Sequence, residues 1–308
     1  MPGLCPTPVK TFLMATAVLL VAAGCSGAED VGEGDSAKPP PAATTSATPS
    51  AQPLTVARVA TLRAESRVHG LALCGRHLAY VQDTSQVVLA DWRSGTSRTV
   101  FSTDHSFLYA ERQVGCRLEV FDTANGYNGE DPSEPGRTLT IDLRTGDVWE
   151  RLAAPHAPSL VGRDGTRRTV ELVSGVSWRS LVLADPSGIE LLSGTGEVVS
   201  AAMSGHHVVW TDGPRSQLSD SVYSVDIRVP DAPVRIAYGG NPVAVAVADE
   251  FLAWTDGPRQ YVAAVGGGSA VTVPGPQASS VLLAADSDLL ARVIGRNGDL
   301  IELLRVDV

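Results

Sequence analysis

Short apolar runs, each bounded by turn residues, follow one another along most of the chain. The clearest succession consists of four runs separated by polar or glycine-rich turns: Val243–Val247, Phe251–Trp254, Tyr261–Val265 and Ala270–Val273. Apolar runs of this length are typical of β-strands, and the turns between them are typical of antiparallel hairpins. The pattern therefore predicts a four-stranded antiparallel sheet in this part of the chain.

A phrase that occurs twice sets the length of the repeat. Residues 208–215 read VVWTDGPR and residues 252–259 read LAWTDGPR, so Trp254 follows Trp210 by 44 positions (254 − 210). Self-similarity at about 40–45 residues is typical of a propeller blade, a four-stranded sheet that buries its faces only against neighbouring blades. The repeat therefore predicts a β-propeller.

The number of blades follows from the same pattern. A turn followed by an apolar strand recurs with marker residues at positions 80, 120, 170, 210, 254 and 291, and the longest step contains the polar insertion 125–136. The last blade lacks an outer strand, and the run Leu54–Leu62 belongs to no other blade. We therefore predict an all-β fold: a six-bladed β-propeller over residues 55–308, closed by an N-terminal strand that removes an open sheet edge.

The repeated phrase also carries a family resemblance. Trp210-Thr211-Asp212 and Trp254-Thr255-Asp256 resemble the Tyr-Trp-Thr-Asp repeat of six-bladed propellers in low-density-lipoprotein-receptor ectodomains. The wider pattern is similar to bacterial TolB-like propellers. The resemblance implies a propeller of the WD40-like kind, and it implies no function, because one fold supports many functions.

The N-terminus has the features of an export signal. Lys10 precedes the apolar run Phe12–Ala23, which is too short to span a bilayer comfortably and fits the core of a signal peptide. The segment that ends in Cys25 resembles the bacterial lipobox, although Ala22 stands where Leu or Val is usual. The resemblance implies a lipoprotein signal peptide over residues 1–24 and a diacylglycerol on Cys25. The alternative is an ordinary secretory signal cut near Gly24, and both interpretations place the mature protein outside the cytoplasm.

The segment that follows the signal is expected to be a disordered linker. Residues 25–54 are rich in Pro, Ala, Ser and Thr and contain little that could be buried in a core. A coil of this length spans about 30 Å on average. We expect it to tether the propeller to the extracytoplasmic face of the cell membrane, through the lipid on Cys25.

The charge of the chain bears on its partners. The formal net charge is −10 at pH 7, and removal of residues 1–24 would take away Lys10 and no acidic residue. No cluster of Lys and Arg is visible along the sequence, so we expect no nucleic-acid partner, since phosphate backbones require basic patches. The same acidity disfavours an electrostatic grip on anionic lipid. Membrane attachment is therefore expected to be hydrophobic or covalent.

Cysteine usage agrees with export. Of four cysteines, Cys5 lies in the signal and Cys25 is the expected lipidation site, which leaves Cys74 and Cys116. Each of these two stands next to a glycine in the turn region of consecutive blades. In an oxidising compartment two remaining cysteines are expected to pair. Zinc binding is disfavoured because no further ligands stand at suitable spacing.

The doubled Asp-Gly-Pro-Arg is a candidate ligand site. It follows the second strand of two adjacent blades, so we expect Arg215 and Arg259 to emerge on one face, near Asp212 and Asp256. Two guanidinium groups from neighbouring blades could hold a carboxylate or a phosphate. The interpretation we favour is turn chemistry, in which the Asp side chain caps its own loop.

The insertion 125–136 is a candidate partner loop. Its candidate contact residues are Asn125, Tyr127, Asn128, Glu130, Asp131 and Glu134. Oxygen-rich loops can bind calcium, which takes six to eight oxygen ligands, but the spacing here fits no calcium-loop signature. A solvated acidic loop is the interpretation we favour, with calcium binding and contact to a protein partner as the alternatives.

The sequence contains no catalytic motif that we recognise. It has no Gly-x-Ser-x-Gly elbow, no His-Glu-x-x-His, no phosphate loop and no spaced set of metal ligands. We therefore predict no cofactor and no metal, and a monomeric, non-catalytic propeller that binds an envelope protein or a ligand. The alternative is an exported lyase or hydrolase with its site at the mouth of the channel. A sensory domain that acts on a membrane partner is a third hypothesis.

Overall fold

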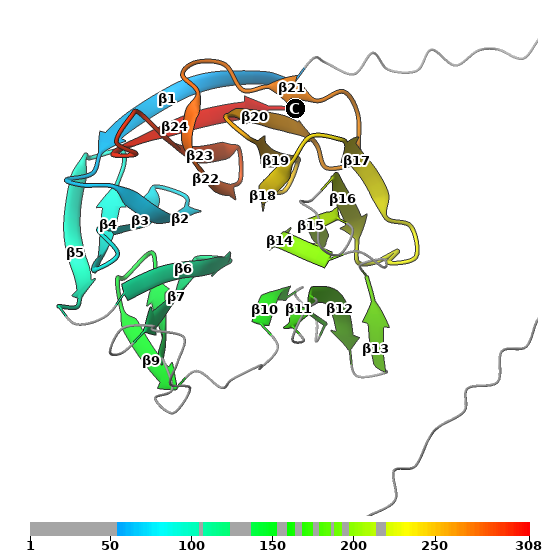
Figure 1. The fold of residues 1–308 in the computed structure, drawn as a ribbon, viewed down its shortest axis with the longest axis horizontal. Helices are drawn as coiled ribbons and strands as arrows, with labels where there is room; N and C mark the ends of the chain where they lie inside the picture. Colours follow the sequence, from blue (N-terminus) through cyan, green and yellow to red (C-terminus); the bar gives the residue numbers. More distant parts are fainter. Residues whose placement is uncertain are drawn as a thin grey trace, which may run out of the picture. The chain divides into compact units, whose positions relative to one another are not determined.

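The computed structural model describes residues 54–104, 107–123, 137–152, 159–163, 168–174, 179–185, 188–192, 197–213 and 220–308. Over these residues the chain forms strands and turns, and no helix is present. Six four-stranded sheets stand as blades around a central axis (Figure 1). The predicted all-β, six-bladed propeller is thereby confirmed.

Each blade is an antiparallel meander whose first strand lies nearest the axis. Blade 1 consists of β2 (Val68–Cys74), β3 (His77–Gln82), β4 (Gln86–Asp91) and β5 (Thr96–Ser102). Blade 2 consists of β6 (Phe107–Val114), β7 (Arg117–Thr123), β8 (Arg137–Asp142) and β9 (Val148–Leu152). Blade 3 consists of β10 (Ser159–Arg163), β11 (Thr169–Ser174), β12 (Arg179–Asp185) and β13 (Gly188–Leu191).

The second half of the ring repeats this plan. Blade 4 consists of β14 (Glu197–Ser204), β15 (His207–Gly213), β16 (Ser221–Asp226) and β17 (Val234–Tyr238). Blade 5 consists of β18 (Pro242–Val247), β19 (Phe251–Asp256), β20 (Arg259–Ala264) and β21 (Val271–Thr272). Blade 6 takes β22 (Ala278–Asp286), β23 (Leu289–Ile294) and β24 (Leu300–Asp307) from the C-terminal end and β1 (Thr55–Arg63) from the N-terminal end.

The ring is closed by strands from both ends of the chain, as the sequence predicted. β1 pairs antiparallel with β24, from Thr55 opposite Asp307 to Arg63 opposite Leu300. Figure 1 shows β1 lying along the outside of β24. This pairing gives blade 6 its outer strand and satisfies the backbone groups of β24 that would otherwise form an open edge.

The repeated Trp-Thr-Asp phrase explains the packing of blades 4 and 5. In each blade the tryptophan on the second strand stacks on a tyrosine of the third strand, with centroids 5.4 Å apart for Trp210 and Tyr223 and 5.3 Å apart for Trp254 and Tyr261. Both indoles are buried. The phrase is therefore a packing motif inside each sheet, since stacked aromatic pairs add to the free energy gained from burial alone.

The pairing of the first and second strands shifts register in all six blades, by a one-residue β-bulge in blades 1 to 5 and by a longer irregularity in blade 6. The register shifts at Val68/Gly70, Ala110/Arg112, Leu160/Gly162, Val198/Ser200, Pro242/Ala244 and Ala278/Leu283. A bulge bends its strand and increases the local twist. Because each bulge falls on the innermost strand, it shapes the wall of the central channel.

Turns divide between two faces of the ring. We call the face that carries the turns from first to second strands the entry face, because β1 begins there at Thr55, beside Asp307. Gly75 and Gly115 adopt positive φ of 55° and 56° in two of these turns, a conformation that glycine adopts without steric cost. We call the opposite face, which carries the turns from second to third strands, the far face.

Five of the six seams between blades contain a shared hydrophobic cluster. The clusters join blades 6 and 1, 1 and 2, 3 and 4, 4 and 5, and 5 and 6. Among the described residues, none of these clusters joins blades 2 and 3. Within the described residues, the core thus consists of five seams that share an apolar cluster and one seam, between blades 2 and 3, that does not.

Candidate functional site

The central channel contains a cavity of ≈ 420 Å³. All six innermost strands line it, mostly with small side chains or backbone, among them Gly70, Ala110, Gly162, Ser200, Ala244 and Ala284. Cavities of about 300–1,000 Å³ are the usual size for small-molecule sites. The channel is therefore large enough to hold a small ligand.

Two glycines of the channel wall allow neighbouring blades to approach closely. A Cβ on Gly70 would overlap the side chain of Ala110 in the next blade. A Cβ on Gly162 would stand 2.5 Å from Met203 Sδ, again across a seam. These glycines are required by packing, since any side chain there would push two inner strands apart.

Three blades each contribute an ionisable side chain to the channel: Arg112 from blade 2, Arg163 from blade 3 and Asp286 from blade 6. Arg112 donates a hydrogen bond to Glu119 on the neighbouring strand of its own blade. Asp286 Oδ2 accepts a hydrogen bond of 2.5 Å from the backbone N–H of Gly75. Two of the three groups are thus engaged in holding strands and blades in place.

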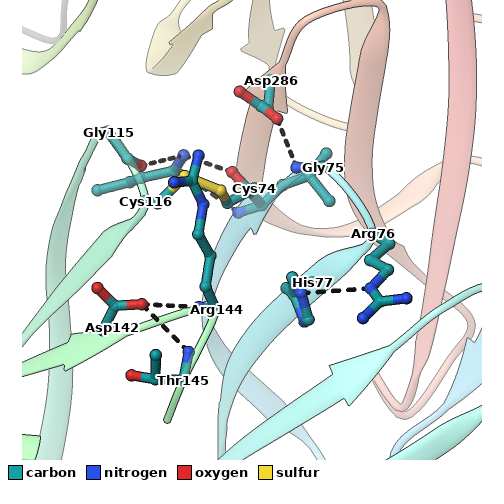
Figure 2. Close-up of a disulfide and its surroundings, with 12 residues drawn as sticks. Cys74, Gly75, Arg76, His77, Gly115, Cys116, Asp142, Arg144, Thr145 and Asp286 are labelled. Atoms are coloured by element: carbon teal, nitrogen blue, oxygen red, sulfur yellow. Dashed lines mark hydrogen bonds between the residues drawn. A yellow bond between two sulfur atoms is a disulfide. The ribbon is translucent and has the colours of Figure 1, made fainter. Parts of the chain in front are cut away.

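A hydrogen-bonded glutamine and a disulfide join blades 1 and 2 at the entry face. Gln113 Oε1 accepts from the backbone N–H of Leu73 at 2.8 Å, and Gln113 Nε2 donates to the carbonyl of Leu73 at 2.6 Å. Beside it, Cys74 and Cys116 form a disulfide with their Cα atoms 5.2 Å apart (Figure 2). The rim of the channel is therefore covalently fixed at this seam.

Among the four residues expected at the doubled Asp-Gly-Pro-Arg, three fall within the described residues. Asp212, Asp256 and Arg259 lie at the ends of strands on the far face. Asp256 and Arg259 form the last strand pair on either side of one turn. Arg215, the fourth residue of the set, lies outside the described residues.

The two aspartates of the doubled phrase have different partners. Asp256 Oδ1 accepts a hydrogen bond of 2.8 Å from the backbone N–H of Asn241, in the loop that enters its own blade. Asp212 is 8% exposed, and its Oδ1 is buried with no hydrogen-bond partner among the described residues. Burial is the main cause that raises the pKa of Asp212, and the nearby negative charge of Asp220 adds to it, while the backbone N–H of Gly213 acts in the opposite direction.

Several expected sites fall outside the described residues. These are the lipidation site Cys25 and the loop residues Asn125, Tyr127, Asn128, Glu130, Asp131 and Glu134. The strands that flank the loop are described: β7 ends at Thr123 and β8 begins at Arg137, and both ends lie on the far face. Topology thus brings the attachment points of the loop to the face that carries Asp256 and Arg259.

Sequence reasoning missed a group of exposed aromatic residues on blade 2. Phe107 and Tyr109 are 51% and 50% exposed on β6, and Trp149 is exposed on β9. The alternation of side chains along β6 places Tyr109 on the opposite side from Leu108, which packs toward blade 1. The sequence alone does not show that these aromatic residues are exposed, because their exposure depends on which seam between blades lacks a shared apolar cluster.

Metal-ligand clusters and membrane-spanning helices are both absent from the described residues. No group of three or more His, Cys, Asp or Glu side chains there is arranged to hold a metal ion. Within the same residues, no helix has the length and hydropathy needed to cross a membrane.

The fold is similar to that of several solved structures. A putative TolB from Agrobacterium tumefaciens matches with a TM-score of 0.53 at 11% identity, over 83% of this chain and 98% of that chain. A chain of a mitotic checkpoint complex matches with a TM-score of 0.53 at 10% identity, over 82% of this chain and 96% of that chain. An oligogalacturonate lyase in complex with manganese reaches a TM-score of 0.45 at 12% identity, over 77% of this chain and 76% of that chain.

The sequence itself matches no protein-family model and no curated protein. At identities of 10% and 11%, the likeness to the checkpoint-complex chain and to the putative TolB shows the propeller fold alone.

Proposed function

We propose that this protein is a membrane-anchored, extracytoplasmic lipoprotein whose propeller acts as a non-catalytic binding or scaffold module for an envelope protein or ligand. The lipid on Cys25 and residues 26–54 would form the anchor and tether. The far face of the propeller, with the loop 125–136, would meet the partner.

The observation that supports this proposal is the separation of the two faces. β1 begins at Thr55 on the entry face, where it pairs with Asp307 at the end of β24. The ends of β7 and β8 that flank the loop, together with Asp256 and Arg259, lie on the far face. We propose that the partner binds the far face because the expected tether joins the propeller at the opposite, entry face.

The channel bears on the alternative of a reaction site, because three blades contribute ionisable side chains to it: Arg112, Arg163 and Asp286. Of these, Arg112 and Asp286 are bound to Glu119 and to the backbone of Gly75. Groups already engaged in structural bonds are poorly placed to exchange protons with a substrate.

The test is site-specific photocrosslinking of the full chain in its native envelope. A crosslinker at position 259 on the far face is compared with one at position 93 on the entry face, and both are repeated with residues 125–136 deleted. We expect one partner to be captured from position 259 only, and to be lost on deletion. The melting temperature and the Cys74–Cys116 disulfide of the deletion variant are measured to show that it folds.

The proposal fails if capture is equal from both positions, if it is unaffected by the deletion in a folded variant, or if no partner is captured at all. A partner captured from position 93 alone would assign recognition to the opposite face.

A further inference from the structure

A second cavity, of ≈ 200 Å³, lies on the entry face between blades 1 and 2. Three basic side chains line it: His77 at the start of β3, Arg98 on β5 and Arg144 in the turn between β8 and β9. They come from three separate segments of the chain. In a protein with a formal charge of −10, this is a local excess of positive charge that the linear sequence does not display.

The two arginines are held in position by their surroundings. Arg98 Nη2 donates a 2.6 Å hydrogen bond to the carbonyl of Thr145 in the neighbouring blade. This bond uses one N–H donor of the Arg98 guanidinium. The turn that carries Arg144 is fixed because Asp142 Oδ1 accepts from the backbone N–H groups of Arg144 and Thr145, at 2.8 and 3.2 Å. Arg98 on β5 is therefore bonded to the turn that carries Arg144, and the backbone of that turn is fixed by Asp142.

The walls of this cavity cannot separate easily. His77 and Arg98 belong to blade 1 and Arg144 to blade 2, and the Cys74–Cys116 disulfide joins the same two blades. Figure 2 shows the Arg144 side chain extending toward that disulfide, while His77 lies apart from it, with its Nε2 accepting from Arg76 Nε at 3.4 Å. A preformed arrangement lowers the entropy lost when a ligand binds.

One carboxylate also lines the cavity, and its bonds are already made. Asp91 Oδ1 accepts from the backbone N–H groups of Arg93 and Ser94, at 3.0 and 3.2 Å, and Asp91 Oδ2 lies 3.4 Å from Arg76 Nε. Desolvation acts to raise the pKa of Asp91, but these N–H groups and the nearby charge of Arg76 outweigh it and lower the pKa below its ordinary value. Asp91 therefore forms its ion pair with Arg76. Because Asp91 is paired in this way, Arg98 and Arg144 are available to an anion.

We propose that Arg98 and Arg144 form a binding site for a phosphate group. A guanidinium presents paired N–H donors that match two oxygens of a phosphate, so two guanidiniums can bind its tetrahedral oxygens from two sides. His77 lines the same cavity, but its Nε2 already accepts a hydrogen bond of 3.4 Å from Arg76 Nε. The cavity has room for the phosphate and a small part of the molecule that carries it. The carrier is either a soluble phosphorylated compound or an anionic phospholipid, since the entry face is also the face at which β1 begins.

This site is independent of the proposed partner face, because it lies on the opposite side of the ring. The first test is calorimetric titration of the full chain with inorganic phosphate, against sodium chloride of equal ionic strength. We expect saturable binding of phosphate by the unmodified chain and a loss of about tenfold or more in affinity for Arg144→Gln, since bonds to charged groups contribute about 1.5–3 kcal/mol each.

Arg93→Gln is the matched control. Arg93 is an exposed arginine on the same face, stacked over Trp92, and it does not line the cavity. We expect Arg93→Gln to retain the affinity within about twofold. Absence of phosphate-specific heat in the unmodified chain, or equal losses in Arg93→Gln and Arg144→Gln, would overturn the proposal.

A second arm identifies the carrier. The full chain with Cys25→Ser, which removes the expected lipidation, is sedimented with phosphatidylcholine vesicles that do or do not contain phosphatidylglycerol. Binding that requires phosphatidylglycerol and is lost on Arg144→Gln assigns a lipid headgroup. Phosphate binding in the calorimeter without vesicle binding assigns a soluble phosphorylated compound.

Discussion

The seam between blades 6 and 1 and the seam between blades 2 and 3 are built on opposite principles. At the first, side chains of both blades form one buried apolar cluster that includes Leu73, Tyr80, Val293 and Leu303. At the second, the side of blade 2 turned toward blade 3 carries half-exposed Tyr109 and an ion-paired network. One seam is held by burial, whereas the other offers polar and aromatic groups.

This difference follows from the pattern of side chains along single strands. β23 is buried along its whole length: Leu289, Ala291 and Val293 pack toward blade 1, and Leu290 packs toward blade 5 beside the buried ion pair of Arg292. β7 alternates between buried Leu118 and Val120 on one side and Glu119 on the other, where Glu119 pairs with Arg112 and Arg151. A propeller therefore needs apolar residues on both sides of a blade to seal both of its seams. Four predictions follow from this contrast between the seams and from the bonds that fix the ring, ordered from the largest expected effect to the smallest.

The largest loss is expected where the well-packed half of the ring buries a charge. Arg292 and Glu302 on blade 6 are 1% and 2% exposed, and Arg292 also donates to Gln260 of blade 5 at 3.2 Å. Arg292→Ala leaves Glu302 buried without its partner, which costs about 3–5 kcal/mol. Urea unfolding of the full chain measures this. Arg305→Ala, which removes an exposed pair with Asp288, is the control and should cost about 1 kcal/mol or less.

A matched pair of truncations compares the two seams directly. Leu303→Ala removes a fully buried side chain from the seam of blades 6 and 1, and we expect a loss of about 2–5 kcal/mol. Val173→Ala alters a partly buried side chain of blade 3, and we expect a loss of about 1 kcal/mol or less. Equal losses in urea unfolding would contradict the contrast between the seams.

The disulfide between Cys74 and Cys116 should contribute somewhat less to the free energy of unfolding than the buried ion pair of Arg292 and Glu302. It closes a loop with a sequence separation of 42, and loops of this size gain about 2–4 kcal/mol from a crosslink. Cys74→Ser combined with Cys116→Ser should lower the free energy of unfolding by that amount. Addition of a reductant to the unmodified chain should reproduce the loss. A reductant effect that persists in the double variant would show that the disulfide is not its source.

The smallest effect is expected for Tyr109→Ser. Tyr109 is half exposed beside the seam of blades 2 and 3, so its removal should change stability by no more than about 0.5 kcal/mol. The thermal midpoint is the measurement. A drop that matches the one for Leu303→Ala would show that Tyr109 packs in a sealed seam and would remove the contrast.

The sequence predicted the ring because its signals are local or periodic. Trp210 and Trp254 mark second strands 44 positions apart (254 − 210), and the unassigned run at Leu54 accounts for the strand missing from blade 6. The third blade follows the same repeat, since the marker at position 170 lies on β11, its second strand.

The close approach of the inner strands and the charged cavity could not be predicted in this way. Gly70 and Gly162 are required by Ala110 and Met203 of the next blade, which lie outside their own repeats. His77, Arg98 and Arg144 are separated by 21 and 46 positions (98 − 77 and 144 − 98) and meet only because two blades stand side by side. Sequence reasoning from the total charge therefore overlooked a local gathering of basic groups.

The pairing of β1 with β24 also dictates when the fold can be completed. Thr55 and Asp307 are 252 positions apart, so the first strand to be synthesised must wait for the last before it gains its partner. Contacts between such distant positions form slowly, because a long loop has to close first. Until then the backbone edge of β1 is unpaired and open to association with other chains. Ring closure is thus expected to be the slow step of folding, and loss of β24 would leave both β1 and β23 without the strand that joins them.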